Sequence, residues 1–349
     1  MWKQHNNRKK MYICHTPYHL LIAIVKQLIE KSKSDLVLCR EELIGSDTIV
    51  RLKNQNVFES IKVYSSLDSR RDLLKDEREV LFHRKRMNMD IEHVVEIKVK
   101  DLKEYDIYIF NDSSVFGYWM NMNGVKYHLL EDGLNTYQTE GQEKAGLKKR
   151  VKTIIKRWLR VDFSYWGASG NYLTIEVNDI HGIKLKEMRK VVAVPRKDLL
   201  SKLSNEDKEL IRKVFLGDKL LLSGEMKEGT LLITQPLSED KEISHEKKMR
   251  IYKYLIKKYG EKQIYIKPHP REEDQYEEFE DCIVIPAKTV PLEVLNIMPD
   301  VHFIRAITCY STAILELENV EDKVIMGYEW VQNFSDNDFN VDITTPALS

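Results

Sequence analysis

The chain has 349 residues, 42% of them hydrophobic and 32% charged, which suits a soluble globular protein with two domains. Its 55 lysines and arginines are balanced by 55 aspartates and glutamates, so the zero formal net charge gives no whole-molecule attraction to nucleic acid. The four cysteines lack a paired spacing, which argues against a zinc site or a disulfide framework and fits a reducing cytosol.

The amino-terminal segment predicts a strand followed by a helix. Residues 11–15 form a short apolar run, Thr16 is a typical helix N-cap, and Pro17 suits the first turn of a buried helix over 18–28. The basic start is not followed by an uninterrupted apolar stretch, and no run approaches the ~18 apolar residues that span a bilayer. We therefore expect a cytoplasmic protein without a signal peptide.

Strands alternate with helices along the rest of the chain. Further strands are predicted at 36–39, 105–110, 125–130, 220–222, 229–234, 263–266, 282–285, 301–304 and 324–326, and helices at 245–259 and 292–298. This alternation indicates βαβ units and parallel sheets. The pattern restarts after Gly217, so we predict two Rossmann-like domains, 1–215 and 216–349. Neither G-x-G-x-x-G nor a P-loop motif is present, which argues against a dinucleotide dehydrogenase or a P-loop enzyme.

Two carboxylates follow the predicted strand at 125–130. Glu131 and Asp132 precede Gly133, which permits a tight turn. Adjacent side chains of an extended segment point in opposite directions, so we expect one carboxylate, Asp132, to face a cleft. An ordinary polar turn has the same sequence.

Residues 147–159 predict a basic amphipathic helix. One face carries Leu147, Val151, Ile154, Ile155 and Trp158, and lysines and arginines lie elsewhere. This pattern is typical of a helix on a membrane surface. A helix docked on the protein's own core would show the same pattern.

Residues 264–271 are the most informative stretch of the chain. A short strand ends at two prolines that bracket His269, and Lys267 and Arg271 flank them. The histidine is therefore expected at the carboxyl edge of a sheet, where open parallel sheets bind their ligands. A histidine between fixed cations suits protonation of an anionic leaving group such as a phosphate. The alternative is a rigid turn without chemistry.

Three other segments are weaker candidates. The strand at 229–234 runs into a proline-broken acidic loop over 235–240, which could also be a solvated loop. Pro291 is expected to open a helix with Glu293 in its first turn, where a carboxylate can hold ribose hydroxyls or serve the helix alone. Ser311 or Thr312 is expected to cap a helix, whose terminus would either bind an anion or be a simple cap.

Together these segments resemble the bacterial sialyltransferases of glycosyltransferase family 52, which act in lipooligosaccharide and capsule synthesis. The resemblance depends on Tyr12-Ile-Cys-His-Thr-Pro-Tyr-His19, Glu131-Asp-Gly133, Pro268-His-Pro-Arg271 and Ser311-Thr312, in this order. It implies a GT-B fold, in which two Rossmann-like domains face each other across a cleft. It also implies CMP-sialic acid as donor, a galactose-type acceptor, inversion at the anomeric carbon and no metal or cofactor.

The resemblance also implies roles for single residues. His269 matches the general acid on the departing CMP, and Asp240 matches the catalytic base. Because the loop is longer than usual in the family, Glu239 is an alternative base, and Asp132 is the base by analogy with related families; we favour Asp240. The expected donor-binding residues are Gln235, Lys267, Pro270, Arg271, Glu293, Ser311, Thr312 and Gly133.

The remaining expectations concern partners. A galactose-terminated glycan, lipid-linked or not, is the expected acceptor, and contact with the inner face of the plasma membrane is one option for location. A homodimer stays open. Asp336-Asn-Asp338 is interpreted as a solvated turn rather than a metal site. The alternatives are a GT-B transferase with another nucleotide donor, a glycerophosphate transferase, and a non-catalytic nucleotide-sugar-binding protein.

Overall fold

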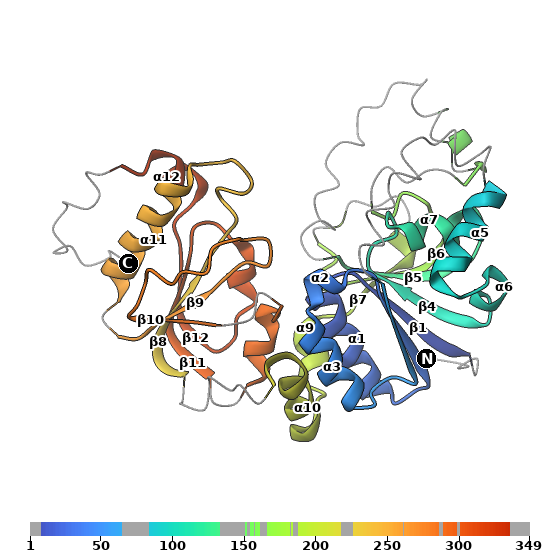
Figure 1. The fold of residues 1–349 in the computed structure, drawn as a ribbon, viewed down its shortest axis with the longest axis horizontal. Helices are drawn as coiled ribbons and strands as arrows, with labels where there is room; N and C mark the ends of the chain where they lie inside the picture. The colour runs from blue at the N-terminus through green and yellow to red at the C-terminus, as the bar shows by residue number, and fades with distance from the viewer. Residues whose placement is uncertain are drawn as a thin grey trace. The chain divides into compact units, whose positions relative to one another are not determined.

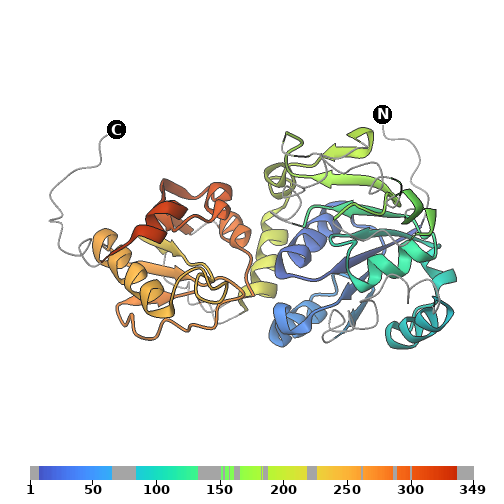
Figure 2. The ribbon, with the colours of Figure 1, turned by 90° about the horizontal axis from the view of Figure 1, so that it is seen from above.

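The computed structural model describes residues 8–64, 84–132, 151, 154–156, 158–160, 166–181, 183, 188–217, 226–260, 262–285, 289–298 and 301–335. The chain divides into two compact units, Met1–Val214 and Phe215–Ser349. Each unit contains one sheet with helices packed around it (Figures 1 and 2).

The amino-terminal unit has a seven-stranded parallel sheet. Its strand order is β3-β2-β1-β4-β5-β6-β7, so the order reverses between β1 and β4. The strands are β1 (Lys9–Cys14), β2 (Ser34–Leu38), β3 (Ser60–Val63), β4 (Tyr105–Ile109), β5 (Tyr127–Leu130), β6 (Tyr172–Val177) and β7 (Val191–Ala193). The helices are α1 (Pro17–Glu30), α2 (Glu41–Ile44), α3 (Ser46–Asn54), α5 (Arg84–Val95), α6 (Val99–Leu102), α7 (Val115–Met122), η3 (Met188–Lys190), α9 (Arg196–Leu200) and α10 (Asn205–Leu216, its last two residues in the second unit).

The carboxyl-terminal unit has a five-stranded parallel sheet. Its strand order is β10-β9-β8-β11-β12, with the reversal between β8 and β11. The strands are β8 (Met226–Ile233), β9 (Ile264–Lys267), β10 (Cys282–Val284), β11 (Val301–Thr308) and β12 (Val320–Ile325). The helices are α11 (His245–Tyr259), η4 (Leu292–Ile297), η5 (Thr312–Glu316) and α12 (Tyr328–Asn333). Open α/β sheets bind ligands outside the carboxyl ends of the strands at such a reversal.

Local sequence explains the two helices that matter most for the site. Thr16 caps α1, because its hydroxyl accepts the main-chain N–H of His19 at 3.2 Å. Ser244 caps α11 in the same way through the N–H of Lys247. One face of α11 then packs on the sheet through a core that includes Ile251, Tyr252, Leu255, Leu232 and Ile266.

Most predicted elements are confirmed, including the helix at 245–259 with both of its ends. Strands β3, β6 and β7 had not been predicted. The strand predicted at 220–222 lies outside the described residues. The helices expected near 292 and 312 are short 3-10 helices rather than α-helices. Among the helices that the structure describes, none is both long and apolar enough to cross a membrane.

Candidate active site

The carboxyl edge of the second sheet gathers most of the predicted site. Strands β8, β9 and β11 are neighbours or next neighbours, and they end at Ile233, Lys267 and Thr308. The loop over 235–240, His269 and the pair at 311–312 follow these three strands directly. Because all three strands run parallel, these segments lie at one edge, and the β8–β11 reversal lies among them.

The loop after β9 holds His269 in one orientation. Its main-chain N–H donates to Glu272 Oε2 at 2.7 Å, and its ring Nδ1 accepts the main-chain N–H of Arg271 at 3.1 Å. Since Nδ1 is an acceptor, the proton of the neutral ring is on Nε2. Burial and the positive charge of Arg271 lower the pKa of His269. Both effects, together with the hydrogen bond that Nδ1 accepts, favour the neutral imidazole with its proton on Nε2.

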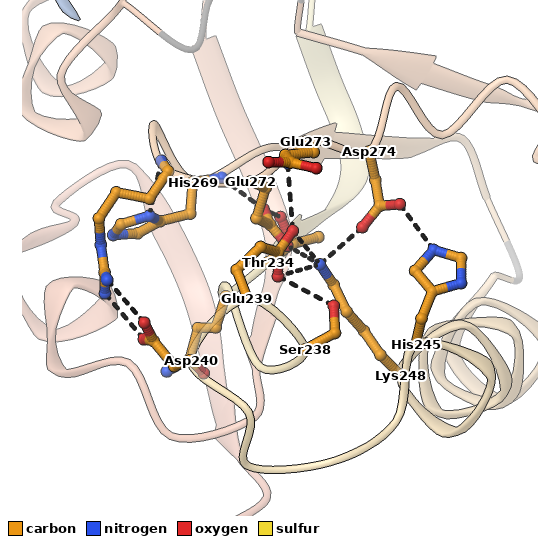
Figure 3. A network of polar contacts seen from close by, with 12 residues as sticks. Thr234, Ser238, Glu239, Asp240, His245, Lys248, His269, Glu272, Glu273 and Asp274 are labelled. Carbon is orange, nitrogen blue, oxygen red and sulfur yellow. Dashed lines mark hydrogen bonds and ion pairs between the residues drawn. The ribbon is translucent and has the colours of Figure 1, made fainter.

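An ionic network around the buried Lys248 and Glu272 holds this loop in place (Figure 3). The carboxylate of Glu272 accepts hydrogen bonds from the hydroxyls of Thr234 and Tyr276. It also lies 2.9 Å from Nζ of Lys248, a fully buried lysine of α11. The same Nζ lies 2.7 Å from Asp274. Burial opposes the charge of this lysine, but hydrogen bonds to Asp274 and Glu272 raise its pKa overall.

The network also fixes Glu239. Its carboxylate lies 3.0 Å from Nζ of Lys248 and accepts the main-chain N–H of Glu273 and the hydroxyl of Ser238. Burial alone would raise the pKa of Glu239, but a hydrogen bond from its own main-chain N–H, together with those from Glu273, Lys248 and Ser238, lowers it to about 2. So weak a base does not fit proton removal from a sugar hydroxyl. Glu239 instead ties the acidic loop to the histidine loop.

Asp240, the next residue, contacts Arg271 at two points. Its Oδ1 and Oδ2 lie 2.7 and 2.8 Å from the two terminal nitrogens of the guanidinium. The pair is on the rim, with the Asp240 side chain 35% and the Arg271 side chain 59% exposed. Each oxygen accepts one N–H of the guanidinium, so the pair holds the Asp240 carboxylate beside Arg271.

Two predicted donor contacts, the buried Lys267 and the partly buried Gln235, are parts of the framework. Burial lowers the pKa of Lys267 to about 8, and its Nζ donates to the main-chain oxygen of Pro268 at 3.0 Å. The side-chain oxygen of Gln235 accepts the N–H of Tyr310 and the hydroxyl of Thr308. Gln235 therefore joins β8 to β11 at the strand-order reversal.

The structure differs from the prediction at the two helix starts expected near 291 and 311. Ser311 is at the N-cap of η5, a 3-10 helix of five residues, but its side chain makes no capping hydrogen bond. Because η5 is a 3-10 helix of only five residues, the helix-dipole argument for an anion site does not hold here. Pro291 precedes η4, with Glu293 in its first turn as expected. Pro270 is exposed beside His269.

The amino-terminal unit contributes a separate polar pair. Asp132 follows β5, and its Oδ1 lies 2.6 Å from Nε2 of His19 in the first turn of α1. The neighbouring Glu131 accepts the main-chain N–H of Asn178 at 2.5 Å and lies 3.9 Å from the buried Arg196. The adjacent carboxylates thus bind different partners. Gly133 lies outside the described residues.

Sequence reasoning missed three residues of this arrangement. Lys248 and Glu272 had no local signal, since a lysine and a glutamate are ordinary in a helix and a loop. His19 had one: with His15 it forms an i, i+4 histidine pair at the start of a buried helix. Across the residues that the structure describes, no group of three or more His, Cys, Asp or Glu side chains could hold a metal ion.

The predicted basic helix is described only in part. Residues 151, 154–156 and 158 are helical. The described apolar residues of its predicted face, Val151, Ile154, Ile155 and Trp158, are exposed, with Trp158 at 81%. Leu147 and most of the basic residues lie outside the described part. The alternative of a face docked on the protein's own core does not fit these exposures.

Comparison with known proteins gives three results. The model of glycosyltransferase family 52 matches residues 43–327. An uncharacterized protein of Haemophilus influenzae is 33% identical over 187 residues, which is 54% of this chain and 58% of that protein. An alpha/beta-galactoside alpha-2,3-sialyltransferase from Photobacterium phosphoreum has a similar structure, with a TM-score of 0.51 and 12% identity, over 92% of this chain and 91% of that one. This last likeness concerns the fold alone.

Proposed function

The chain belongs to glycosyltransferase family 52, and from this premise we propose that it transfers sialic acid from CMP-sialic acid to a terminal galactose-type sugar of a bacterial surface glycan. The observation that carries the proposal is the pair His269 and Arg271, held on one loop at the ligand-binding edge of the second sheet. The lipooligosaccharide or capsule as acceptor is part of the proposal.

The proposed chemistry begins at the donor phosphate. The bond between the anomeric carbon and the phosphate oxygen breaks, and its electron pair leaves with CMP. The Nε2–H of His269 and the guanidinium of Arg271 stabilise the growing negative charge. The acceptor hydroxyl attacks the opposite face of the sugar, which inverts the anomeric carbon, and a carboxylate takes its proton. Fixed cationic and neutral donors can serve the phosphate without a divalent ion.

Two carboxylates are candidates for the base. Asp240 lies on the same edge as His269, where its carboxylate pairs with Arg271. A donor phosphate would compete for this guanidinium, so donor binding could release Asp240. Asp132 is in the other unit and accepts a hydrogen bond from a neutral ring. The family resemblance favours Asp240, and the paired variants in the Discussion decide between them.

The test is a donor panel. The purified full-length chain is incubated with CMP-sialic acid, UDP-sugars and GDP-sugars and with galactose-terminated acceptors, with and without EDTA. We expect CMP release, an acceptor heavier by one sialyl residue, and the same rate in EDTA. Release of UDP or GDP would favour another donor. Binding of CMP without any product would favour a non-catalytic protein.

We also propose that the exposed apolar face near Trp158 contacts an anionic membrane surface, because the same predicted helix is rich in lysine and arginine. Co-sedimentation with anionic vesicles should exceed that with neutral vesicles. The double variant Ile154→Glu/Trp158→Glu should lose the difference while keeping activity on a soluble acceptor. Equal sedimentation of both proteins would refute the contact.

A further inference from the structure

A buried histidine connects two elements at the carboxyl edge of the first sheet. His19 comes from α1, which follows β1, whereas Asp132 follows β5, and β4 lies between these strands. Phe110, the residue after β4, stacks on the His19 ring with centroids 4.3 Å apart and planes 7° apart. The ring is 1% exposed. The edge at the strand-order reversal therefore holds this imidazole in a single plane.

The main chain also fixes which nitrogen of His19 carries the proton. The N–H of His15 donates to Nδ1 at 3.2 Å. Because Nδ1 accepts, the proton of the neutral ring is on Nε2, which lies 2.6 Å from Oδ1 of Asp132. The imidazole thus donates to this carboxylate and has no vacant nitrogen with which to remove a proton from it.

The adjacent carboxylate, that of Glu131, contacts residues of the framework. Glu131 is buried between the main chain at Asn178 and the buried Arg196, and both partners belong to the framework around β6 and α9. Asp132 is also mostly buried, but it follows β5 at the carboxyl edge of the sheet, and its Oδ1 lies 2.6 Å from Nε2 of the oriented His19 ring. A hydrogen bond from an N–H held in a fixed plane fixes the direction in which the carboxylate oxygen points.

We infer that His19 is a positioning residue, which holds the Asp132 carboxylate in the orientation that accepts a hydrogen bond from a hydroxyl of the acceptor sugar. The inference rests on the proposed transfer to a sugar hydroxyl. His19 does not touch the substrate in this role. It acts through Asp132, so its loss should affect turnover far more than donor binding, which is assigned to the other unit.

The kinetic test uses three variants of the full-length enzyme. His19→Phe keeps a ring against Phe110 but removes the Nε2 donor, and we expect kcat to fall on the order of 10²-fold with the donor KM little changed. His19→Gln can place an amide N–H near the former Nε2 and should recover part of this loss. His128→Phe is the matched control, because it keeps the stack on Tyr108 and removes only the contact with Thr174. Its kcat should stay normal.

A double-mutant cycle separates positioning from a structural role. If His19 acts through Asp132, His19→Phe should cause no further loss of kcat in an Asp132→Asn background. Multiplicative losses in the double variant would overturn the inference, as would a folded His19→Phe enzyme with normal kcat. An inactive wild-type enzyme would instead refute the proposed function.

A measurement independent of activity tests the geometry, and its wild-type part still applies if a variant fails to fold. Nitrogen-15 spectra of the histidine rings in the wild-type protein should show His19 protonated on Nε2 with Nδ1 as an acceptor. Asp132→Asn should shift the Nε2 proton signal of His19. Protonation on Nδ1 instead, or no response to Asp132→Asn, would overturn the inference directly.

Discussion

Arg271 and Asp240 form a two-point ion pair at the carboxyl edge of the second sheet, next to the histidine whose ring the Arg271 main chain orients. One residue thus contacts two members of the proposed site, through its backbone and its side chain. In the proposed reaction the guanidinium exchanges Asp240 for the donor phosphate, which both binds the donor and releases the carboxylate.

Arg271→Ala should weaken CMP binding by about 10-fold or more, because a charge-assisted, two-point contact with the phosphate is lost. The free energy of unfolding should change by only about 0–1 kcal/mol, since the pair is largely exposed. Titration calorimetry with CMP and thermal unfolding measure the two effects. Arg305→Ala is the matched control, because it breaks the similar exposed pair with Asp322 on β11 and β12. Equal CMP affinity in both variants would remove Arg271 from the donor site.

His269→Ala should lower kcat by ~10²–10⁴-fold, the usual range for lost help in proton transfer, and leave CMP affinity within a few-fold. His269→Gln can still donate a hydrogen bond from nearly the same place. Substantial activity in the glutamine variant would show that hydrogen-bond donation suffices, as the lowered pKa of His269 suggests. Turnover near normal in the alanine variant would contradict a role in the reaction.

Asp240→Asn and Asp132→Asn identify the base. The amide has nearly the shape of the carboxylate but negligible basicity, so the true base variant should lose transfer almost completely and keep CMP affinity. Both should be assayed on one acceptor, with folding checked by circular dichroism. A larger loss in a folded Asp132→Asn enzyme would assign the base to the amino-terminal unit. Comparable modest losses in both would mean that neither is the base.

Lys248→Met should destabilise the protein by about 3–5 kcal/mol, because it removes the buried positive charge that Glu272, Glu239 and Asp274 share. Urea unfolding measures the loss. The control Lys262→Met breaks an exposed pair with Glu228 and should cost about 0–1 kcal/mol. Similar losses in the two variants would argue against the network as a source of stability.

The same network predicts an acid dependence for the wild-type protein. The pKa of Glu239 in the folded state is about 2, below its ordinary value of 4.5, so this group stabilises the fold above pH 4.5. That contribution should disappear as the pH falls from about 4.5 to about 2. Urea unfolding along this range should show a smaller decrease in Lys248→Met than in the wild type. An identical decrease in both would contradict the assignment.

Local sequence signals determined much of the architecture. The alternation of apolar runs predicted most of the strands and the helix at 245–259, which the structure shows as α11 with Ser244 as its N-cap. The two prolines around His269 also determined its place at a strand end. These features depend on residues within a few positions of each other, so the sequence specifies them before any tertiary contact forms.

Only the tertiary structure decided which charged groups meet. The strand order brings α11 and the loop after β9 together, so Lys248 binds both Glu272 and Glu239. The same kind of long-range contact joins His19 to Asp132 across β4. No local sequence pattern indicates which residue a charged side chain will pair with. The partner depends on how the strands are ordered in the sheet.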